Sequence, residues 1–377
     1  MVADVRQAWH PQSLVARGCQ LFVLVGAKPS AGQARLPPEH QEPTVPPQGH
    51  LQALPIHFAI PQSKWEATEA LRAQHLSRKR RGFALTVPSL TGRSVHSFGG
   101  EAAYYEHYSA SFFAVTARKL GWDCLRHYEV ILSGAVPFLL GIDRLPPGTM
   151  ASFPRAVVRR AMRLPGVPSE EEVLARLGRG ELPELRWEAF DLGAYAALRG
   201  ELLRHAERRL LTPHLAALVV PRRPRARVLL HARRFRPGVM PEELDYMLAL
   251  LAVGLIESGH EVYAAPGLPD VLFNDFRGNT RMYYGRGFTY AGVVPRQYQV
   301  VDASNASGPW DYYILSTRSN WCFPDAFPEA VRDASVVVAV DGNDIVTPEP
   351  CTPPPEANLL FARESERYAQ GLSLGSL

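Results

Sequence analysis

The sequence predicts an α/β protein built from two doubly wound domains. Strand-like and helical segments alternate in both halves of the chain, and alternation of this kind is typical of parallel sheets covered by helices. The strand-like segments are short and apolar throughout, as expected of strands that are buried on both faces. The 377 residues are also enough for two domains that each have a core.

Composition divides the chain into five parts. Residues 1–53 are mixed and partly proline-rich, which predicts a poorly ordered leader. Residues 221–227 (PRRPRAR) contain two prolines and four arginines and read as a linker. The linker separates a first domain with trailing helices, 54–220, from a second α/β domain, 228–366. Residues 367–377 are expected to form a tail.

The first domain contains one well-marked strand–helix–strand unit. Strands are predicted at Leu54–Ile60 and Arg81–Pro88. A helix is predicted over Asp123–Ser133, with its first residue as the N-cap and with Gly134 ending it. The apolar run Ala135–Leu140 then predicts a buried strand.

The second predicted domain shows the same alternation of strands and helices. Strands are predicted at Val228–His231, Glu261–Ala265, Asp311–Thr317 and Ser335–Val340, and a helix over Pro241–Ser258. Proline suits the first helical position, and the glycine after Ser258 suits the helix end.

Charge and cysteine content exclude several classes of protein. The net charge of +4 is small, and only 4 of the 41 basic residues are lysine, which indicates either a GC-rich genome or anion binding by some arginines. The basic clusters 78–81 and 222–227 have no interleaved aromatic residues, so we expect no nucleic-acid partner. The four cysteines form no C-x-x-C pair, so neither a zinc site nor a thioredoxin motif is expected.

No apolar stretch has the length of a membrane-spanning helix, so we expect no membrane span. A soluble location is therefore the default expectation, with a Golgi-type compartment as the alternative.

The chemistry-bearing residues gather around the predicted helix at 123–133. Asp123, Arg126 and Glu129 are spaced three apart and share one helix face. Such a row is either a solvated ladder of ion pairs or a binding face. Arg118 and Lys119 precede the helix, and a helix N-terminus with nearby cations suits a diphosphate.

This region resembles the donor-binding half of the exostosin-like glycosyltransferases. The residues that carry the resemblance are Ser111-Phe112-Phe113, Arg118-Lys119, Arg126, Glu129, Gly134 and Pro137. The longer string GWDCLRHYEVILSGAVP is similar to a subgroup of that family found in algae and large viruses.

The resemblance implies that Glu129 holds ribose or sugar hydroxyls, and that Arg126 and Lys119 contact phosphate or sugar. The full set of expected donor-binding residues is Arg118, Lys119, Trp122, Asp123, Arg126, Glu129 and Gly134. Trp122 would stack on a base or sugar, with core packing as the alternative.

A second resemblance covers the other half of the chain. The strings YGRGFT (284–289), DYYILS (311–316) and VAVDGND (338–344) resemble the acceptor-side domain of the same subgroup, where that domain comes first. The strings FARE (361–364) and PIHFAIP (55–61) would join in the usual order if the chain ends were connected. The swapped order indicates a circular permutant, a slice across a tandem array or a faulty gene model.

The resemblance implies a GT-B-like enzyme, with two Rossmann-like domains facing a cleft. It further implies a UDP- or GDP-linked sugar as co-substrate, no other cofactor, and a glycan, protein or small-molecule acceptor. His231 and Asp341 end predicted strands and are the candidates for the catalytic base, with loop hydrogen bonding as the alternative role. Arg286 lies between two glycines and is expected near an anion unless the glycines only supply a turn. No metal site is predicted.

Two other classes of function are compatible with the sequence to different degrees. An inactive nucleotide- or carbohydrate-binding module, or a fragment of a tandem glycosyltransferase, fits the swapped order of the halves. A nicotinamide-dependent oxidoreductase is disfavoured, because no predicted strand leads into G-x-G-x-x-G.

Overall fold

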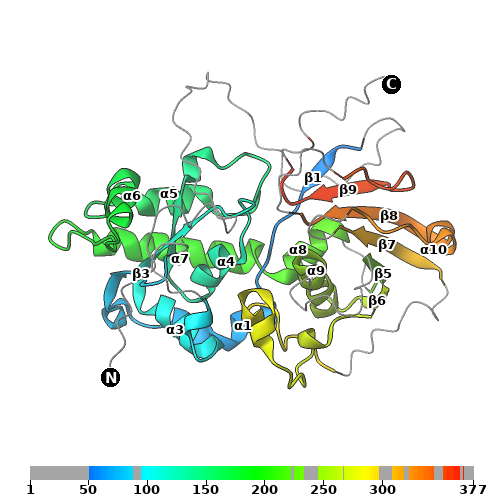
Figure 1. Cartoon of the computed structure of the whole chain (residues 1–377), viewed down its shortest axis with the longest axis horizontal. Coiled ribbons are helices and arrows are strands. Elements are labelled where there is room, and N and C mark those ends of the chain that lie inside the picture. The colour runs from blue at the N-terminus through cyan, green and yellow to red at the C-terminus, as the bar shows by residue number, and fades with distance from the viewer. Residues whose placement is uncertain are drawn as a thin grey trace, which may run out of the picture. The chain divides into compact units, whose positions relative to one another are not determined.

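Two parallel β-sheets organise the chain in this computed structural model (Figure 1). The structure describes residues 51–87, 95–221, 225–232, 245–265, 267–296, 308–317, 322–343, 351–365 and 368. All of them belong to one compact unit, Val45–Leu377.

The smaller sheet has three strands in the order β2-β3-β4. Strands β2 (Arg81–Phe83), β3 (Ser111–Ala117) and β4 (Val136–Leu140) are all parallel. Helix α3 (Glu101–Ser109) connects the first two strands and α4 (Leu125–Leu132) the last two. Parallel neighbours need such crossover connections, and the helices bury the strands.

Further helices gather around this sheet and lead to the second one (Figure 1). They are α1 (Gln62–Ala67), α2 (Glu69–Arg72), α5 (Arg155–Met162), α6 (Glu170–Gly178), α7 (Leu192–Arg209) and α8 (Thr212–Val219). Ser169 and Glu172 form a capping box at the start of α6, and Asp191 caps α7, so local sequence determines both helix starts.

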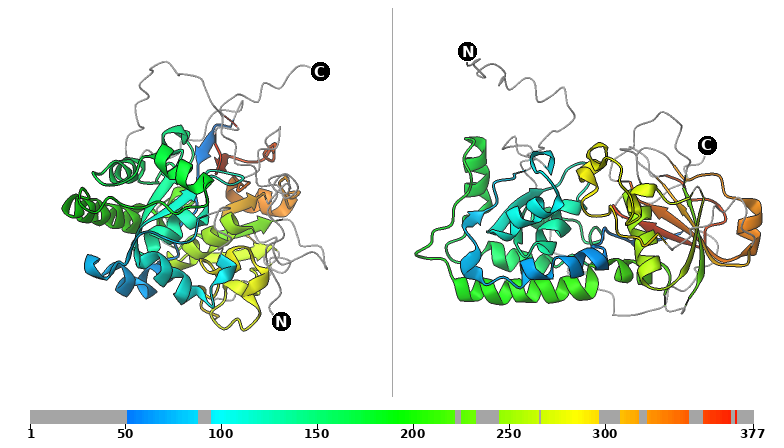
Figure 2. Two further views of the ribbon diagram at one scale, coloured as in Figure 1. Left: turned by 60° about the vertical axis from the view of Figure 1, so that its left-hand side comes forward. Right: turned by 90° about the horizontal axis from the view of Figure 1, so that it is seen from below.

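The larger sheet has six parallel strands in the order β1-β9-β8-β7-β5-β6. Its strands are β1 (Ala53–Pro55), β5 (Arg227–Ala232), β6 (Glu261–Ala265), β7 (Trp310–Ser316), β8 (Ala334–Asp341) and β9 (Leu359–Ala362). Helices α9 (Tyr246–Glu257) and α10 (Pro328–Asp333) pack against it. Strand β1 lies beside β9, although the two are far apart in sequence (Figures 1 and 2).

One continuous apolar core joins residues of both sheets with α8 and α9, and a second, smaller core lies on the other face of the six-stranded sheet. The prediction of an α/β protein with parallel sheets is therefore confirmed. The two sheets share the larger core, so a division into two Rossmann-like domains stays a proposal.

Several local predictions can be compared with the structure. Gly134 ends α4 with a left-handed φ of 76°, as predicted. Asp123 as the N-cap of that helix is wrong, because Cys124 holds the cap position and the Asp123 side chain is used elsewhere. The strand predicted at Leu54–Ile60 is shorter and ends at Pro55.

The predicted domain boundaries stay a prediction. Most of the leader 1–53, part of the linker 221–227 and the tail 367–377 apart from Tyr368 lie outside the described residues. The start of the helix predicted at Pro241 also lies outside them, and α9 begins at Tyr246 with Asp245 as its cap.

Two further features concern the whole unit. A disulfide joins Cys322 to Cys351, which the cysteine spacing did not predict. None of the helices in the described ranges combines the length and apolar character needed to cross a bilayer.

Candidate functional site

The carboxyl edges of the two sheets meet. Asp123 follows β3 and Arg363 follows β9, and the Arg363 Nη1 atom donates a 2.7 Å hydrogen bond to the Asp123 carbonyl oxygen. Ligands of parallel α/β proteins bind beyond the carboxyl ends of the strands. This shared edge is therefore where a ligand is expected.

Glu129 is one of the two predicted donor-binding carboxylates, and it is buried on α4. Helix α4 places it in a buried position where Tyr104 Oη donates to its Oε2 atom at 2.7 Å. Thr289 Oγ1 donates to its Oε1 atom at 2.5 Å. Burial, followed by the charge of Glu129, raises the pKa of Tyr104 well above its usual value, so this hydroxyl keeps its proton and acts as the donor.

Arg126 lies one helical turn before Glu129 and carries an unused donor. Its Nη1 atom is buried and has no hydrogen-bond partner. Burial lowers the pKa of Arg126, but Cys124, Tyr108, Tyr104 and Glu129 together raise it above the usual value, so the side chain stays cationic. A buried cationic N–H group requires an acceptor, so Arg126 Nη1 is a candidate for contact with an anionic ligand.

Arg286 borders the same cluster from the C-terminal half. Its Nη1 atom donates to the Phe98 carbonyl oxygen, and its buried Nε atom has no partner. Arg286 contacts Phe98 and Phe288, whose rings lie 5.3 and 5.5 Å from the Tyr104 ring. Burial raises the pKa of Tyr104 and the charge of Arg126 acts to lower it, so both arginines lie near that tyrosine. Arg286 has φ 57°, a left-handed conformation that costs a non-glycine residue about 1–2 kcal/mol.

Asp123 instead holds separate parts of the chain together. Its Oδ2 atom accepts from Phe58 N at 2.7 Å and its Oδ1 atom accepts from Tyr128 Oη at 2.7 Å. The Asp123 N–H group donates to Glu364 Oε1 at 3.1 Å. Protein donors occupy this carboxylate, so the structure places it in a buried junction and not on the Glu129 face.

Glu364 takes the place predicted for the donor diphosphate. Its carboxylate accepts from the backbone N–H groups of Trp122 and Asp123, just before α4. Burial raises the pKa of Glu364 to about 7, although Arg363 and these N–H groups lower it. Glu364 is the last residue of the FARE string (361–364), but the sequence predicted no role for it.

The raised pKa leads to a prediction about stability. The folded chain binds the Glu364 proton more tightly than the unfolded chain, so this group's stabilising contribution is present below the ordinary glutamate pKa of 4.5 and is lost as pH rises to about 7. We expect the unfolding free energy of Glu364→Gln, minus that of wild type, to increase by roughly 2–3 kcal/mol from pH 5 to pH 7.5. Urea unfolding at a series of pH values measures this difference.

The matched control is Glu188→Gln, which changes an exposed carboxylate. Burial lowers the pKa values of His57, His127 and His231 below that of an unfolded histidine, so these groups add a pH dependence of their own and the comparison is always mutant minus wild type at one pH. A Glu364→Gln difference that stays constant with pH would show that Glu364 is ionised throughout.

The other predicted donor residues lie around the same helix but not at one point. Arg118 and Lys119 are exposed, and the Arg118 guanidinium lies 5.7 Å from the ring of the buried Trp122. Gly134 lies at the opposite end of α4, where its carbonyl oxygen accepts from Lys79 Nζ at 3.0 Å. Of the predicted set, the structure therefore gathers Arg126 and Glu129, together with Arg286, around Tyr104.

The two predicted base candidates are both engaged by protein groups. His231 Nδ1 lies 2.7 Å from Tyr313 Oη, its ring stacks on Phe327 at 4.1 Å, and burial lowers its pKa to about 4. Asp341 Oδ1 accepts from Thr317 Oγ1 at 2.8 Å, and Oδ2 accepts from the Tyr368 hydroxyl at 2.6 Å.

Potential metal ligands do not cluster in the described part of the chain. Within those ranges, no three His, Cys, Asp or Glu side chains lie close enough together to hold an ion. Asp344, the last residue of the VAVDGND string, is outside those ranges.

No family model, curated protein or solved structure matches the chain. The resemblance to exostosin-like glycosyltransferases therefore stays a prediction from the strings quoted above.

Proposed function

We propose that this protein is a glycosyltransferase that moves a sugar from a UDP- or GDP-linked donor to a hydroxyl acceptor. The observation that carries the proposal is the buried Arg126 Nη1 atom without a partner, one turn from the buried carboxylate of Glu129. A nucleotide sugar offers both matching groups, since its phosphates accept from a guanidinium and its hydroxyls donate to a carboxylate.

Each residue has a defined part in this reaction. Glu129 orients ribose or sugar hydroxyls, and Arg126 stabilises the charge that develops on the departing nucleoside diphosphate. The acceptor oxygen loses its proton to a base and forms a bond to the anomeric carbon, while the bond from that carbon to the phosphate oxygen breaks. In the proposed GT-B-like arrangement, two Rossmann-like halves contribute their strand carboxyl ends to this site.

A second candidate function is a nucleotide- or carbohydrate-binding module without catalysis. The observation in its favour is that His231 is held by Tyr313 and Asp341 by Thr317 and Tyr368. Each group is thus already hydrogen-bonded within the protein. Sugar binding without turnover would identify this function.

Calorimetric titration with UDP-glucose, UDP-N-acetylglucosamine and GDP-mannose tests the donor site. We expect wild type to bind at least one of them, and Arg126→Gln and Glu129→Gln each to weaken that binding about 10–100-fold. This range corresponds to the loss of one hydrogen bond to a charged group. Arg160→Gln, on α5 and paired with Glu201 at the surface, is the matched control and should bind as wild type does.

Release of nucleotide is measured in the same samples with and without acceptor sugars. Binding together with release supports a transferase, and binding without release supports the binding module. Equal affinity of the Arg126→Gln and wild-type chains, or no binding of any donor by wild type, would show that the donor site is wrongly assigned.

A further inference from the structure

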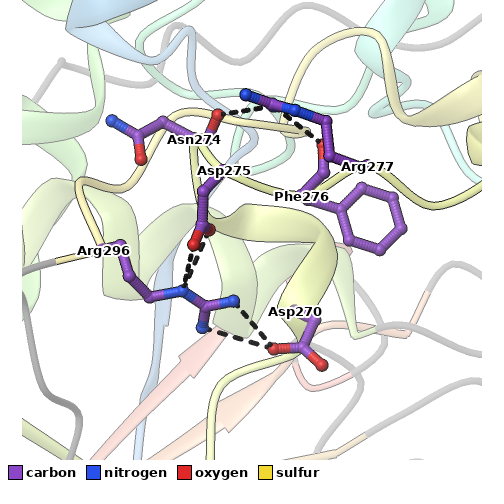
Figure 3. Close-up of polar contacts among 6 residues, drawn as sticks. All are labelled: Asp270, Asn274, Asp275, Phe276, Arg277 and Arg296. Carbon is purple, nitrogen blue, oxygen red and sulfur yellow. Dashed lines mark hydrogen bonds and ion pairs between the residues drawn. The ribbon is translucent and has the colours of Figure 1, made fainter.

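The segment Gly267–Arg296 forms a loop whose two ends are joined. Asn274 N donates to the Val294 carbonyl oxygen at 2.8 Å, and Val294 N donates to the Leu272 carbonyl oxygen at 2.8 Å. Arg296 Nε lies 2.9 and 2.8 Å from the two carboxylate oxygens of Asp275, and its Nη1 lies 3.4 Å from Asp270 Oδ1 (Figure 3). These internal contacts hold the shape of the loop.

Inside this loop, Arg277 Nη1 contacts the carbonyl oxygens of Asn274 and Phe276, at 3.3 Å each (Figure 3). The loop is also part of the main apolar core, to which it contributes Val271, Leu272, Phe288, Tyr290 and Val294.

Three hydrogen bonds join the loop to residues 98–129, and one of them ends on Glu129. Thr289 Oγ1 donates to Glu129, Tyr105 Oη donates to the Phe288 carbonyl oxygen at 3.1 Å, and Arg286 donates to the Phe98 carbonyl oxygen. Thr289 is 1% exposed and Glu129 is 6% exposed, so no ligand hydroxyl reaches the carboxylate while the loop is in this position.

We infer that the Thr289 hydroxyl occupies the place on Glu129 Oε1 that a ligand hydroxyl takes, and that a ligand must displace Thr289 to bind there. The inference rests on the proposed donor site. Thr289 is an internal competitor, because its hydroxyl is held beside Glu129 at every ligand concentration. It therefore sets the affinity of the site.

The surroundings of Thr289 also indicate the class of ligand. The buried Arg286 Nε atom has no partner, and Arg126 Nη1 has none on the helix side. A ligand that replaces the Thr289 hydroxyl next to these two cations must offer a hydroxyl donor and an anionic acceptor. The site is therefore built for a phosphorylated polyol, such as a nucleotide sugar, and not for a neutral sugar.

Thr289→Val tests the exchange, because valine keeps the shape and removes the competing hydroxyl. Glu129 Oε1 then lacks a donor in the free chain and regains one from the ligand, so we expect the three nucleotide-sugar probes to bind about tenfold more tightly or better. Thr289→Ser keeps the hydroxyl and should resemble wild type. Thr280→Val, on the same loop at Thr280–Met282, is the matched control and should also leave affinity unchanged.

The outcomes separate this inference from the proposed function. If wild type binds a probe and Thr289→Val binds it equally or less tightly, the inferred exchange is wrong while the donor site stands. If no variant binds any nucleotide sugar, the donor site and the exchange both fail. Binding of neutral glucose as tightly as UDP-glucose would overturn the assigned ligand class.

Discussion

Gly254→Ala is expected to destabilise the chain by about 3 kcal/mol or more, or to prevent folding. Gly254 lies in α9 against the start of α8, and an added Cβ atom would lie 2.6 Å from the Thr212 carbonyl carbon and closer still to its oxygen. Both atoms are backbone, so the two helices would have to separate. The gain in helix propensity, about 1 kcal/mol, is too small to offset this.

Gly200→Ala on α7 is the matched control for this substitution. Its added Cβ atom would meet only the flexible Arg204 side chain, at 3.3 Å, so we expect stability to stay the same or rise by up to about 1 kcal/mol. Urea unfolding of both variants measures the difference. Equal stabilities would mean that α8 and α9 are not in the close contact described.

Arg363→Met is expected to cost about 3–5 kcal/mol of unfolding free energy. Arg363 is buried, donates to the carbonyl oxygens of Asp123 and Gly342, and lies over the Phe58 ring at 4.4 Å. Its charge also lowers the pKa values of the neighbouring Asp123 and Glu364 carboxyls. Removing it leaves buried acidic groups without their cation.

Two further variants test whether the loss comes from the buried position of Arg363 and from its interaction with Glu364. Arg332→Met removes an exposed arginine that is paired only at the surface with Asp333, and should change stability by less than about 1 kcal/mol. Adding Glu364→Gln to Arg363→Met should recover part of the loss, because one of the stranded carboxylates becomes neutral. Additive losses would show that the two residues do not interact.

The parallel sheets and the end of α4 at Gly134 could be predicted because their signals are local. Alternating apolar strands and helices, and a glycine after a helix, depend only on neighbouring residues. The same local reasoning failed at Asp123, because the partner of its carboxylate, the Phe58 N–H group, lies 65 residues away.

Only the part of the candidate site that lies on α4 could be predicted from the sequence. Arg126 and Glu129 stand on one helix at recognisable spacing, and the structure brings them together with Tyr104. Thr289 contacts Glu129 across 160 residues and Glu364 contacts Asp123 across 241 residues. No short-range pattern contains such pairs, so neither Thr289 nor Glu364 could be assigned a role from the sequence alone.

The position of β1 has a mechanical consequence. Because β1 belongs to the six-stranded sheet, the chain passes from that sheet to the three-stranded sheet after Pro55 and returns through α8 before β5. Two connections restrict how one sheet can move against the other more than a single connection would, and the apolar core shared by both sheets restricts it further. Glu129 and Thr289, which lie far apart in sequence, are thereby kept in register.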